Sequence, residues 1–326
     1  MSLLFADSFD GVIAGGAKWD NWHTSNEIHS NYGRNGTKGM LVTGSSLAPI
    51  VAIKALDPVT NRVTVGAWVY CENPSGGPGT FDEVFRLDSG SGTVVVTWGE
   101  SLTRFRLSGT GLATQEIGAA GTGQRLTWIF LELMWEPGVA VEVRANGTSL
   151  FSGTPGGSGT PNVFQIRRQS LRWRVEDLYI LDSSGSHQND FLGPIKIINL
   201  KPDGAGNRTE LDPEPAGNNW ERVSDGDDAT YVEGDPGDGD LYTFDDLSGS
   251  EDVLGVVQYF RAFDSEGGAI TGRAIARVDG TEYDGDDVVL PGSVATHVQP
   301  WDVNPDTSQP WTPAEVNGAE FGVEFA

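Results

Sequence analysis

The side chains best suited by type and spacing to do chemistry are three carboxylates near the end of the chain. Glu282, Asp284 and Asp286 are each separated by one residue, and a β-strand would place all three on one face. Glycoside hydrolysis needs two carboxylates held at a fixed separation, so this spacing raises the alternative of a glycosidase. Gly285 interrupts the motif, however, and we favour an acidic turn without catalytic function.

A second acidic group, Asp225, Asp227 and Asp228, could supply oxygen ligands to a hard cation such as calcium. The segment lacks the Asp-x-Asp-x-Asp-Gly order and the later Glu that an EF-hand loop requires. Acidic loops that keep the protein in solution are therefore the favoured interpretation, with calcium as the alternative. No other cofactor is expected.

A nucleophile with a neighbouring base is not recognisable. The sequence has no Gly-x-Ser-x-Gly motif, its four histidines are scattered, and its only cysteine, Cys71, follows Tyr70 in an apolar run. We expect a buried, unreactive thiol. The prediction is a protein that is not an enzyme.

Aromatic side chains beside polar ones suggest a different function, the binding of sugars. Trp19, Trp22 and His23 lie close together in a segment with several Gly and Asn residues, and ligand sites combine aromatic walls with a few polar groups. These three residues are the predicted ligand-binding set. An ordinary hydrophobic core is the alternative for the two tryptophans, and it is the favoured interpretation for Trp98.

The strongest structural pattern lies at 126–151. In 126–135 both alternate faces are largely apolar, which is typical of a strand buried on both sides. After a break at 136–138, Val and polar residues alternate as in a half-buried strand, and Asn146-Gly147 is a hairpin signal. The pattern predicts a β-meander.

Shorter strands are predicted around this meander, separated by turns every ~8–12 residues, the spacing of a sandwich. They cover 63–70, 83–87, 93–98, 103–107, 163–167 and 170–181. No segment before residue 182 has helical periodicity. Residues 1–186 are therefore predicted to form an all-β sandwich.

The composition changes near residue 187. Residues 201–240 are crowded with Asp, Gly, Pro and Asn, and so long an irregular tract is unusual within one compact domain. We therefore predict a second, smaller β-sandwich domain at 187–326, in which this tract forms loops. Its expected strands are 195–200, 252–263, 269–278, 288–290 and 319–325.

The charge of the chain limits the classes of partner that it can bind. The formal net charge is −25, from 46 acidic and 21 basic residues, which argues against a surface that neutralises nucleic-acid phosphates. No apolar run approaches the ~18 residues of a membrane span, and the N-terminus does not resemble a signal peptide. We expect synthesis in the cytoplasm without insertion into a membrane.

Four motifs of the first half resemble the concanavalin/laminin-G type of jelly roll. They are Phe5-Ala-Asp-Ser-Phe-Asp, Gly66-Ala-Trp-Val-Tyr, Val141-Glu-Val-Arg-Ala-Asn-Gly and Glu176-Asp-Leu-Tyr-Ile-Leu-Asp. The resemblance implies a fold that is usually non-catalytic and binds glycans or proteins. Such domains are normally exported, which conflicts with this N-terminus.

An ordered set of short motifs along nearly the whole chain resembles structural proteins of tailed bacteriophages. It comprises Asp177-Leu-Tyr-Ile-Leu-Asp, Asn189-Asp-Phe-Leu-Gly-Pro, Pro202-Asp-Gly, Thr230-Tyr-Val, Val256-Val-Gln, Trp311-Thr and Phe321-Gly-Val-Glu. Virion proteins are made in the host cytoplasm and released by lysis, so this resemblance removes the conflict.

The resemblance implies a non-enzymatic virion component, either a minor tail protein or a capsid decoration or fibre. Its expected partners are other virion proteins, sister subunits in a homo-oligomer, with a trimer as the first guess, and host-surface glycans. The alternative is a polysaccharide depolymerase of the phage or its host. Convergence of Glu282, Asp284 and Asp286 in a groove would favour that alternative.

Overall fold

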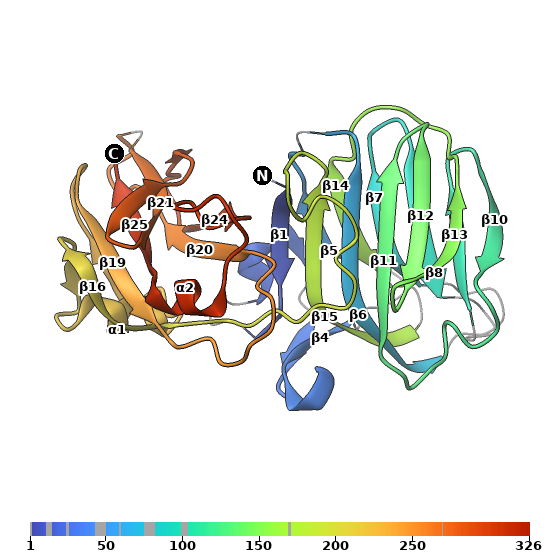
Figure 1. Cartoon of the computed structure of the whole chain (residues 1–326), viewed down its shortest axis with the longest axis horizontal. Coiled ribbons are helices and arrows are strands. Elements are labelled where there is room, and N and C mark those ends of the chain that lie inside the picture. Colours follow the sequence, from blue (N-terminus) through green and yellow to red (C-terminus); the bar gives the residue numbers. More distant parts are fainter. Residues whose placement is uncertain are drawn as a thin grey trace. The chain divides into compact units, whose positions relative to one another are not determined.

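The computed structural model describes residues 2–10, 15–23, 26–42, 50–58, 60–74, 82–98, 104–168, 171–268 and 270–326. These residues are mainly in antiparallel β-strands, so the all-β fold class is confirmed. They fall into two compact units (Figure 1): the first contains residues 2–10 and Lys18–Ile197, and the second contains residues 15–17 and Ile198–Ala326. No helix of the described residues has the length and apolarity to cross a membrane.

The first unit consists of two antiparallel sheets (Figure 1). The first sheet contains, in spatial order, β13 (Thr148–Gly153), β12 (Ala140–Ala145), β11 (Ile129–Glu136), β6 (Val63–Pro74), β15 (Leu171–Asp182), β4 (Gly39–Val42) and β3 (Glu27–His29), with β1 (Leu3–Asp7) beside β15. The second sheet contains, in order, β10 (Leu112–Ile117), β9 (Phe105–Gly109), β8 (Thr93–Trp98), β7 (Glu83–Asp88), β14 (Val163–Arg167), β5 (Ile50–Ala55) and β2 (Asn21–Trp22).

Alternation along β6 and β11 builds the core of this unit. Val65 lies opposite Leu133 and Ala67 opposite Leu131 in the antiparallel register, and all four are buried. Burying such side chains contributes roughly 1.5–3 kcal/mol each for the larger ones. The meander predicted at 126–151 is confirmed as β11, β12 and β13. Residues 103 and 170 of two other predicted strands lie outside the described residues, as does residue 269 in the second unit.

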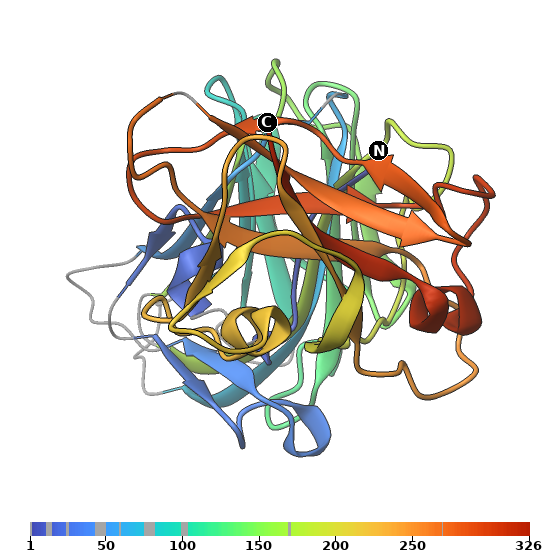
Figure 2. The same cartoon turned by 90° about the vertical axis from the view of Figure 1, so that its left-hand side faces the viewer.

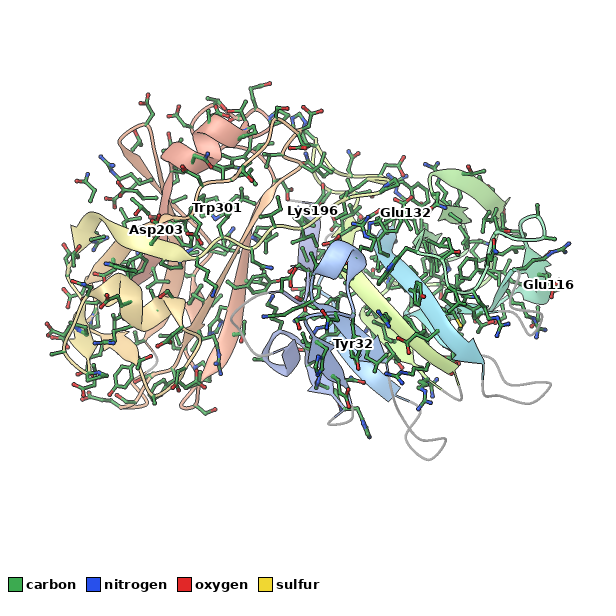
Figure 3. The ribbon with its side chains drawn as sticks, turned by 90° about the horizontal axis from the view of Figure 1, so that it is seen from below. Tyr32, Glu116, Glu132, Lys196, Asp203 and Trp301 are labelled. Atoms are coloured by element: carbon green, nitrogen blue, oxygen red, sulfur yellow. The ribbon has the colours of Figure 1, made fainter. Side chains whose placement is uncertain are left out.

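The outer face of the first sheet is partly covered by residues 191–197, which we call the strap. The strap lies along the sheet without pairing as a strand. Side chains of the sheet bind its backbone instead: Leu192 N donates to Tyr179 Oη (3.2 Å), Gly193 N to Glu132 Oε1 (2.9 Å) and Ile197 N to Asp177 Oδ1 (2.9 Å). Figure 3 labels Lys196 of the strap and Glu132 of the sheet.

The strand predicted at 195–200 is wrong, because residues 195–197 belong to the strap and no strand forms at 195–200. Three of the strap's N–H groups are bound by side chains of the sheet, and Trp68 Nε1 donates to the carbonyl of Ile195 (3.0 Å), so these backbone groups are satisfied without a neighbouring strand. The strap also explains why β11 is apolar on both faces, because Phe130 and Glu132 on its outer face are buried. The first unit thus continues to Ile197, beyond the boundary expected at 186/187.

Glu132 is an acid inside this covered face. Burial raises the pKa of Glu132, while hydrogen bonds from Tyr179 and Gly193 act in the opposite direction. Its Oε1 accepts from Tyr179 Oη at 2.7 Å, and its Oε2 has no hydrogen-bond partner among the described residues. The charged form is therefore only partly stabilised in the folded protein.

We expect Glu132→Gln to remove a pH dependence from the stability of the first unit. A raised pKa means that the folded state binds the proton more tightly than the unfolded chain, whose value is 4.5. Protonated Glu132 therefore stabilises the folded state fully below pH 4.5, and this stabilisation is lost as the pH rises through the pKa that Glu132 has in the folded state. In chemical denaturation across this pH range, the free energy of unfolding of the variant should increase relative to that of the wild type as the pH rises. Two curves of this free energy against pH that run parallel would contradict the prediction.

The second unit is built on a six-stranded antiparallel sheet. Its order is β16 (Pro202–Thr209), β19 (Gly239–Phe244), β25 (Glu320–Phe325), β21 (Thr271–Val278) and β22 (Thr281–Asp284), with β23 (Val288–Val289) also beside β21. Two further pairs are β17 (Asp212–Glu214) with β18 (Tyr231–Glu233) and β20 (Val256–Ala262) with β24 (Ala295–Trp301). Figure 2 shows two short helices at separate places in this unit, α1 (Asn219–Ser224) in gold and α2 (Pro313–Gly318) in red.

A small aromatic core holds the second unit together. Ala276 of β21 and Phe321 of β25 pack with Trp301, Trp311 and Val316 of α2. Trp311 Nε1 donates to the carbonyl of Trp301 at 3.0 Å, so the buried indole keeps a hydrogen bond. A capping box between Thr312 and Glu315 begins α2 and places Val316 against this core.

The tract at 201–240 is not a set of loops, because it contains β16, β17, α1 and β18 and the start of β19. The strand β16 lies at the edge of its sheet, where Pro202 at its first position is tolerated. Its half-buried positions include Gly204 and Gly206. A Cβ added at Gly204 would lie 2.6 Å from Thr243 Oγ1, and one added at Gly206 would lie 2.6 Å from the backbone of Leu241. Because this close approach requires glycine at these positions, β16 lacks the apolar alternation that normally indicates a strand.

Candidate functional site

The structure brings Trp19, Trp22 and His23 together but buries the first of them. Trp19 is 6% exposed, its ring centroid lies 5.2 Å from that of Phe5, and its Nε1 donates to Asp7 Oδ2 at 3.1 Å. Trp22, on the edge strand β2, and His23 are half-buried. Trp19 therefore offers no open ring face, and sugar binding at this place would depend on Trp22 and His23.

The acidic group at Asp225, Asp227 and Asp228 forms local turns after α1. Asp225 accepts from the backbone N–H of Asp227 (2.9 Å) and from Thr230 Oγ1 (2.8 Å), and these hydrogen bonds lower the pKa of Asp225. Asp228 accepts from Arg261 Nη2 at 2.9 Å. Within the described part of the chain, no group of three or more His, Cys, Asp or Glu residues is arranged to hold a metal ion.

The third acidic motif is a strand for most of its length, not the turn that we expected. Asp279 and Gly280 have positive φ angles and make the turn, so Glu282 and Asp284 fall on β22. Asp286 lies beyond the strand, where its backbone N–H donates to Gln299 Oε1 at 2.8 Å.

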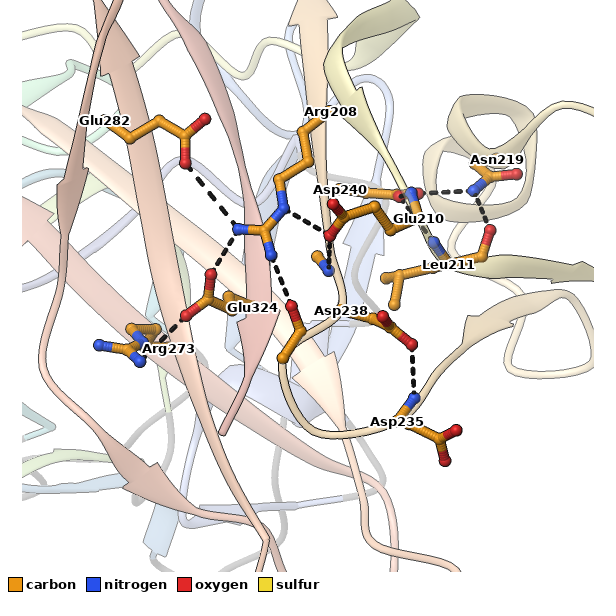
Figure 4. A network of polar contacts seen from close by, with 12 residues as sticks. Arg208, Glu210, Leu211, Asn219, Asp235, Asp238, Asp240, Arg273, Glu282 and Glu324 are labelled. Carbon is orange, nitrogen blue, oxygen red and sulfur yellow. Dashed lines mark hydrogen bonds and ion pairs between the residues drawn. The ribbon is translucent and has the colours of Figure 1, made fainter.

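Ion pairs hold the two strand carboxylates of this motif, and Figure 4 shows that of Glu282. Glu282 Oε2 lies 3.8 Å from Arg208 Nη1, and Asp284 Oδ2 lies 3.1 Å from Arg273 Nη1. Glu324 pairs with both arginines. Because each carboxylate faces a different arginine across the sheet, the motif forms a charge network and does not present a pair of free acids to a substrate.

A row of planar side chains lies on the outer face of the first sheet, in a part that the strap does not bind. We call it the aromatic row; its members, in order, are His29, Tyr32, Arg174, Tyr70 and Trp128. The centroids of His29 and Tyr32 are 5.1 Å apart, and those of Tyr70 and Trp128 are 5.3 Å apart. The Arg174 guanidinium lies between, with Cζ at 4.9 Å from the Tyr32 centroid and 5.2 Å from the Tyr70 centroid.

Strand alternation and register place these side chains. On β15, Trp173 and Val175 point into the core, so Arg174 points outward, directly opposite Tyr70 on β6. Trp128 directly precedes β11, the neighbour of β6, and His29 ends β3. Side chains from four segments far apart in sequence thus meet on one face, and Figure 3 labels Tyr32 there.

One carboxylate holds two arginines at the row. Glu72 Oε2 lies 2.6 Å from Arg172 Nε, and Glu72 Oε1 accepts from Arg174 Nε at 2.5 Å. Arg174 Nη1 also donates to the carbonyl of Asn31 at 3.1 Å, so this guanidinium is fixed in place. The aromatic residues of the row are half-buried except His29, which is exposed, and the surface therefore combines partly exposed rings with oriented polar groups.

The chemistry available here is binding. A ring face accepts the apolar side of a planar or ring-shaped ligand, and fixed donors select its polar groups. Cys71, beneath this part of the sheet, is fully buried, and burial raises the pKa of its thiol to about 12. As we expected, the thiol is therefore not a nucleophile at neutral pH.

Alternation along the strand predicted at 170–181 is enough to place Arg172 and Arg174 outward, but it does not connect them with Tyr70, Trp128 or Tyr32. The usable signal was the alternation on β6, which places Tyr70 on the face opposite Val69. What was missing was the register between strands that are about a hundred residues apart in the chain.

No family model matches the sequence, and no curated protein matches it. Solved structures that are similar include the cellulose-induced protein Cip1, at 14% identity over 54% of this chain and 96% of that chain, with a TM-score of 0.42. Domain 4 of the arabinanase AbnA from Geobacillus stearothermophilus, in complex with arabinotriose, has 17% identity over 55% and 92%, with a TM-score of 0.39. The galectin LEC-6 of Caenorhabditis elegans has 11% identity over 40% and 89%, with a TM-score of 0.32.

Proposed function

We propose that this chain is a non-enzymatic glycan-binding protein and that the aromatic row is its binding surface. The observation that carries the proposal is the alternation of accessible rings with a fixed guanidinium between them. Sugar rings have an apolar face, which stacks on aromatic side chains, and hydroxyl groups, which need donors and acceptors such as Arg174 and Glu72.

The length of the row supports an oligosaccharide as the ligand. The row extends from the β11 side of the first sheet to β3, across the intervening strands β6, β15 and β4. Since neighbouring strands are roughly 4.8 Å apart, it is on the order of 19 Å long. A single sugar would cover only part of this surface.

The absence of catalysis is part of the proposal. The acids that came closest to a glycosidase motif, Glu282 and Asp284, each pair with an arginine, which supports a structural role for them. A general acid would need a carboxyl group that faces the scissile bond with a raised pKa.

Trp128→Ala should weaken glycan binding about tenfold or more, because it removes one end of the ring surface. The protein would first be screened on an array of defined oligosaccharides, and calorimetry with the strongest binder would then compare the variants. Trp128 is half-buried, so the fold should persist. Trp22→Ala is the matched control, since it removes a half-buried tryptophan from the place predicted from sequence.

Two results would reject the proposal. One is that no oligosaccharide is retained by the wild-type protein. The other is that Trp22→Ala abolishes binding while Trp128→Ala leaves it intact, which would move the site to β2.

The same protein is proposed to be a component of a tailed-phage virion, as a minor tail protein or as a capsid decoration or fibre. The ordered motifs along the chain support this context. Sister subunits, as a trimer, and other virion proteins would be its partners. Immunogold electron microscopy of a lysate should place the protein on tails or capsids, and light scattering should show a trimer; label confined to debris, or a strict monomer, would contradict these two parts.

A further inference from the structure

Arg172 stands beside the aromatic row with its guanidinium only partly used. Its Nε pairs with Glu72, and its Nη2 donates to Tyr32 Oη over a long 3.4 Å. Among the described residues none binds its Nη1. The side chain is 48% exposed, whereas that of Arg174 is 22% exposed and bound at both ends. Arg172 therefore keeps unused donor capacity on an exposed side chain beside the row.

The charges of this surface do not balance. Glu72 is shared by Arg172 and Arg174, so the three groups together carry one net positive charge. Glu27 lies on the same face of the sheet, but β4 separates it from Arg174, a gap of roughly 10 Å. That gap is about one Debye length or more at physiological salt, so Glu27 neutralises the pair only weakly. A positive patch is notable on a chain with a net charge of −25.

We infer that the aromatic row binds acidic glycans, namely saccharides whose units carry a carboxylate, and that Arg172 selects them. The inference rests on the proposed function and adds the ligand class. The planar guanidinium fork matches a carboxylate in two parallel hydrogen bonds, and no lysine ammonium could do the same. The ring faces of Tyr70 and Trp128 would hold the sugar while its carboxylate meets Arg172.

The test uses matched pairs of oligosaccharides. The probes are a panel of uronic-acid oligosaccharides of several linkages and their carboxyl-reduced, neutral counterparts of equal length. Wild-type protein should bind at least one acidic probe about 10-fold to 100-fold more tightly than its neutral partner, as expected for hydrogen bonds to a charged group. Raising the salt concentration should narrow this difference.

The Arg172→Gln variant should lose most of this preference and bind the neutral probe as the wild type does. Arg104→Gln is the matched control, because Arg104 is another arginine with a partly exposed side chain and one carboxylate partner, Glu116, and it directly precedes β9 of the second sheet. It should bind both probes unchanged. Thermal unfolding of both variants would verify that the fold is intact.

The outcomes separate this inference from the proposed function. Equal binding of acidic and neutral probes, unchanged in Arg172→Gln, would overturn the inference and leave glycan binding in place. Tighter binding of sulfated neutral oligosaccharides than of any uronic-acid probe would also overturn it, because the carboxylate would not be the selected group. Failure of every probe to bind would reject both the inference and the proposed function.

Discussion

Replacing Asp240 with alanine should lower the free energy of unfolding of the second unit by about 3–5 kcal/mol, because it removes a buried acceptor shared by four donors. Asp240 is fully buried on β19. Its Oδ1 accepts from the backbone N–H groups of Glu210 (2.7 Å) and Leu211 (3.0 Å). Its Oδ2 accepts from Asn219 Nδ2 (2.6 Å) and Tyr242 Oη (2.8 Å), as Figure 4 shows in part.

The size of the effect follows from what these bonds join. They connect β19 to the chain between β16 and β17 and to the first residue of α1, so one carboxylate holds three elements. Alanine would leave the donors without an acceptor in a buried place, each at a cost of about 1–3 kcal/mol before water enters. Tyr242 supports the picture, since burial beside Asp240 raises the pKa of its phenol.

Calorimetry of Asp240→Ala and of a control, Asp203→Ala, would check the prediction. Asp203 is exposed on the neighbouring strand β16 and accepts one hydrogen bond, from Thr243 Oγ1 at 2.8 Å. Its loss should change the free energy of unfolding by no more than about 0.5–1 kcal/mol. Equal effects at the two positions would show that the Asp240 network contributes little.

Gly66→Ala should destabilise the first unit by about 3 kcal/mol, because its Cβ would overlap a side chain that cannot move away. The added atom would lie 2.4 Å from Cε1 and 2.7 Å from Cζ of Tyr179. The Tyr179 ring is fully buried, stacks on Phe130 with a centroid distance of 6.3 Å, and donates to Glu132. Any shift that relieves the overlap would lengthen that charge-assisted hydrogen bond and loosen the strap.

Gly292→Ala provides the control for this substitution. Gly292 has no atom within 4 Å of an added Cβ and does not require a positive φ, so alanine should be tolerated there. Thermal unfolding should show a lower transition for the first unit in Gly66→Ala only. A wild-type transition would mean that Tyr179 has more freedom than its contacts indicate.

Much of the first unit could be predicted because its strands are long and regular. Apolar alternation indicates β6 and β15, and the Asn146-Gly147 turn indicates that β12 and β13 are neighbours in the meander. In the second unit the same pattern located β20, β21 and β25 to within a few residues at most ends. Local pattern is sufficient where each strand carries its own half of a core.

The strap, β16 and the aromatic row could not be predicted for a common reason. Each depends on contacts between residues distant in the chain. Glu132 binds a strap N–H group, Gly206 of β16 lies against Leu241, and Tyr70 lies beside Arg174. Such contacts leave no local periodicity. The burial of Trp19 has the same cause, since its polar neighbours in sequence did not reveal its contact with Phe5.

The single buried thiol gives the chain an internal reporter of its own opening. Cys71 belongs to the first unit only, and with a pKa of about 12 it is almost wholly protonated and shielded at neutral pH while that unit is folded. In the unfolded chain its pKa returns to about 8.5, and the exposed thiolate reacts readily. The alkylation rate of the native protein therefore measures how often the first unit opens, independently of the second unit and without any engineered label.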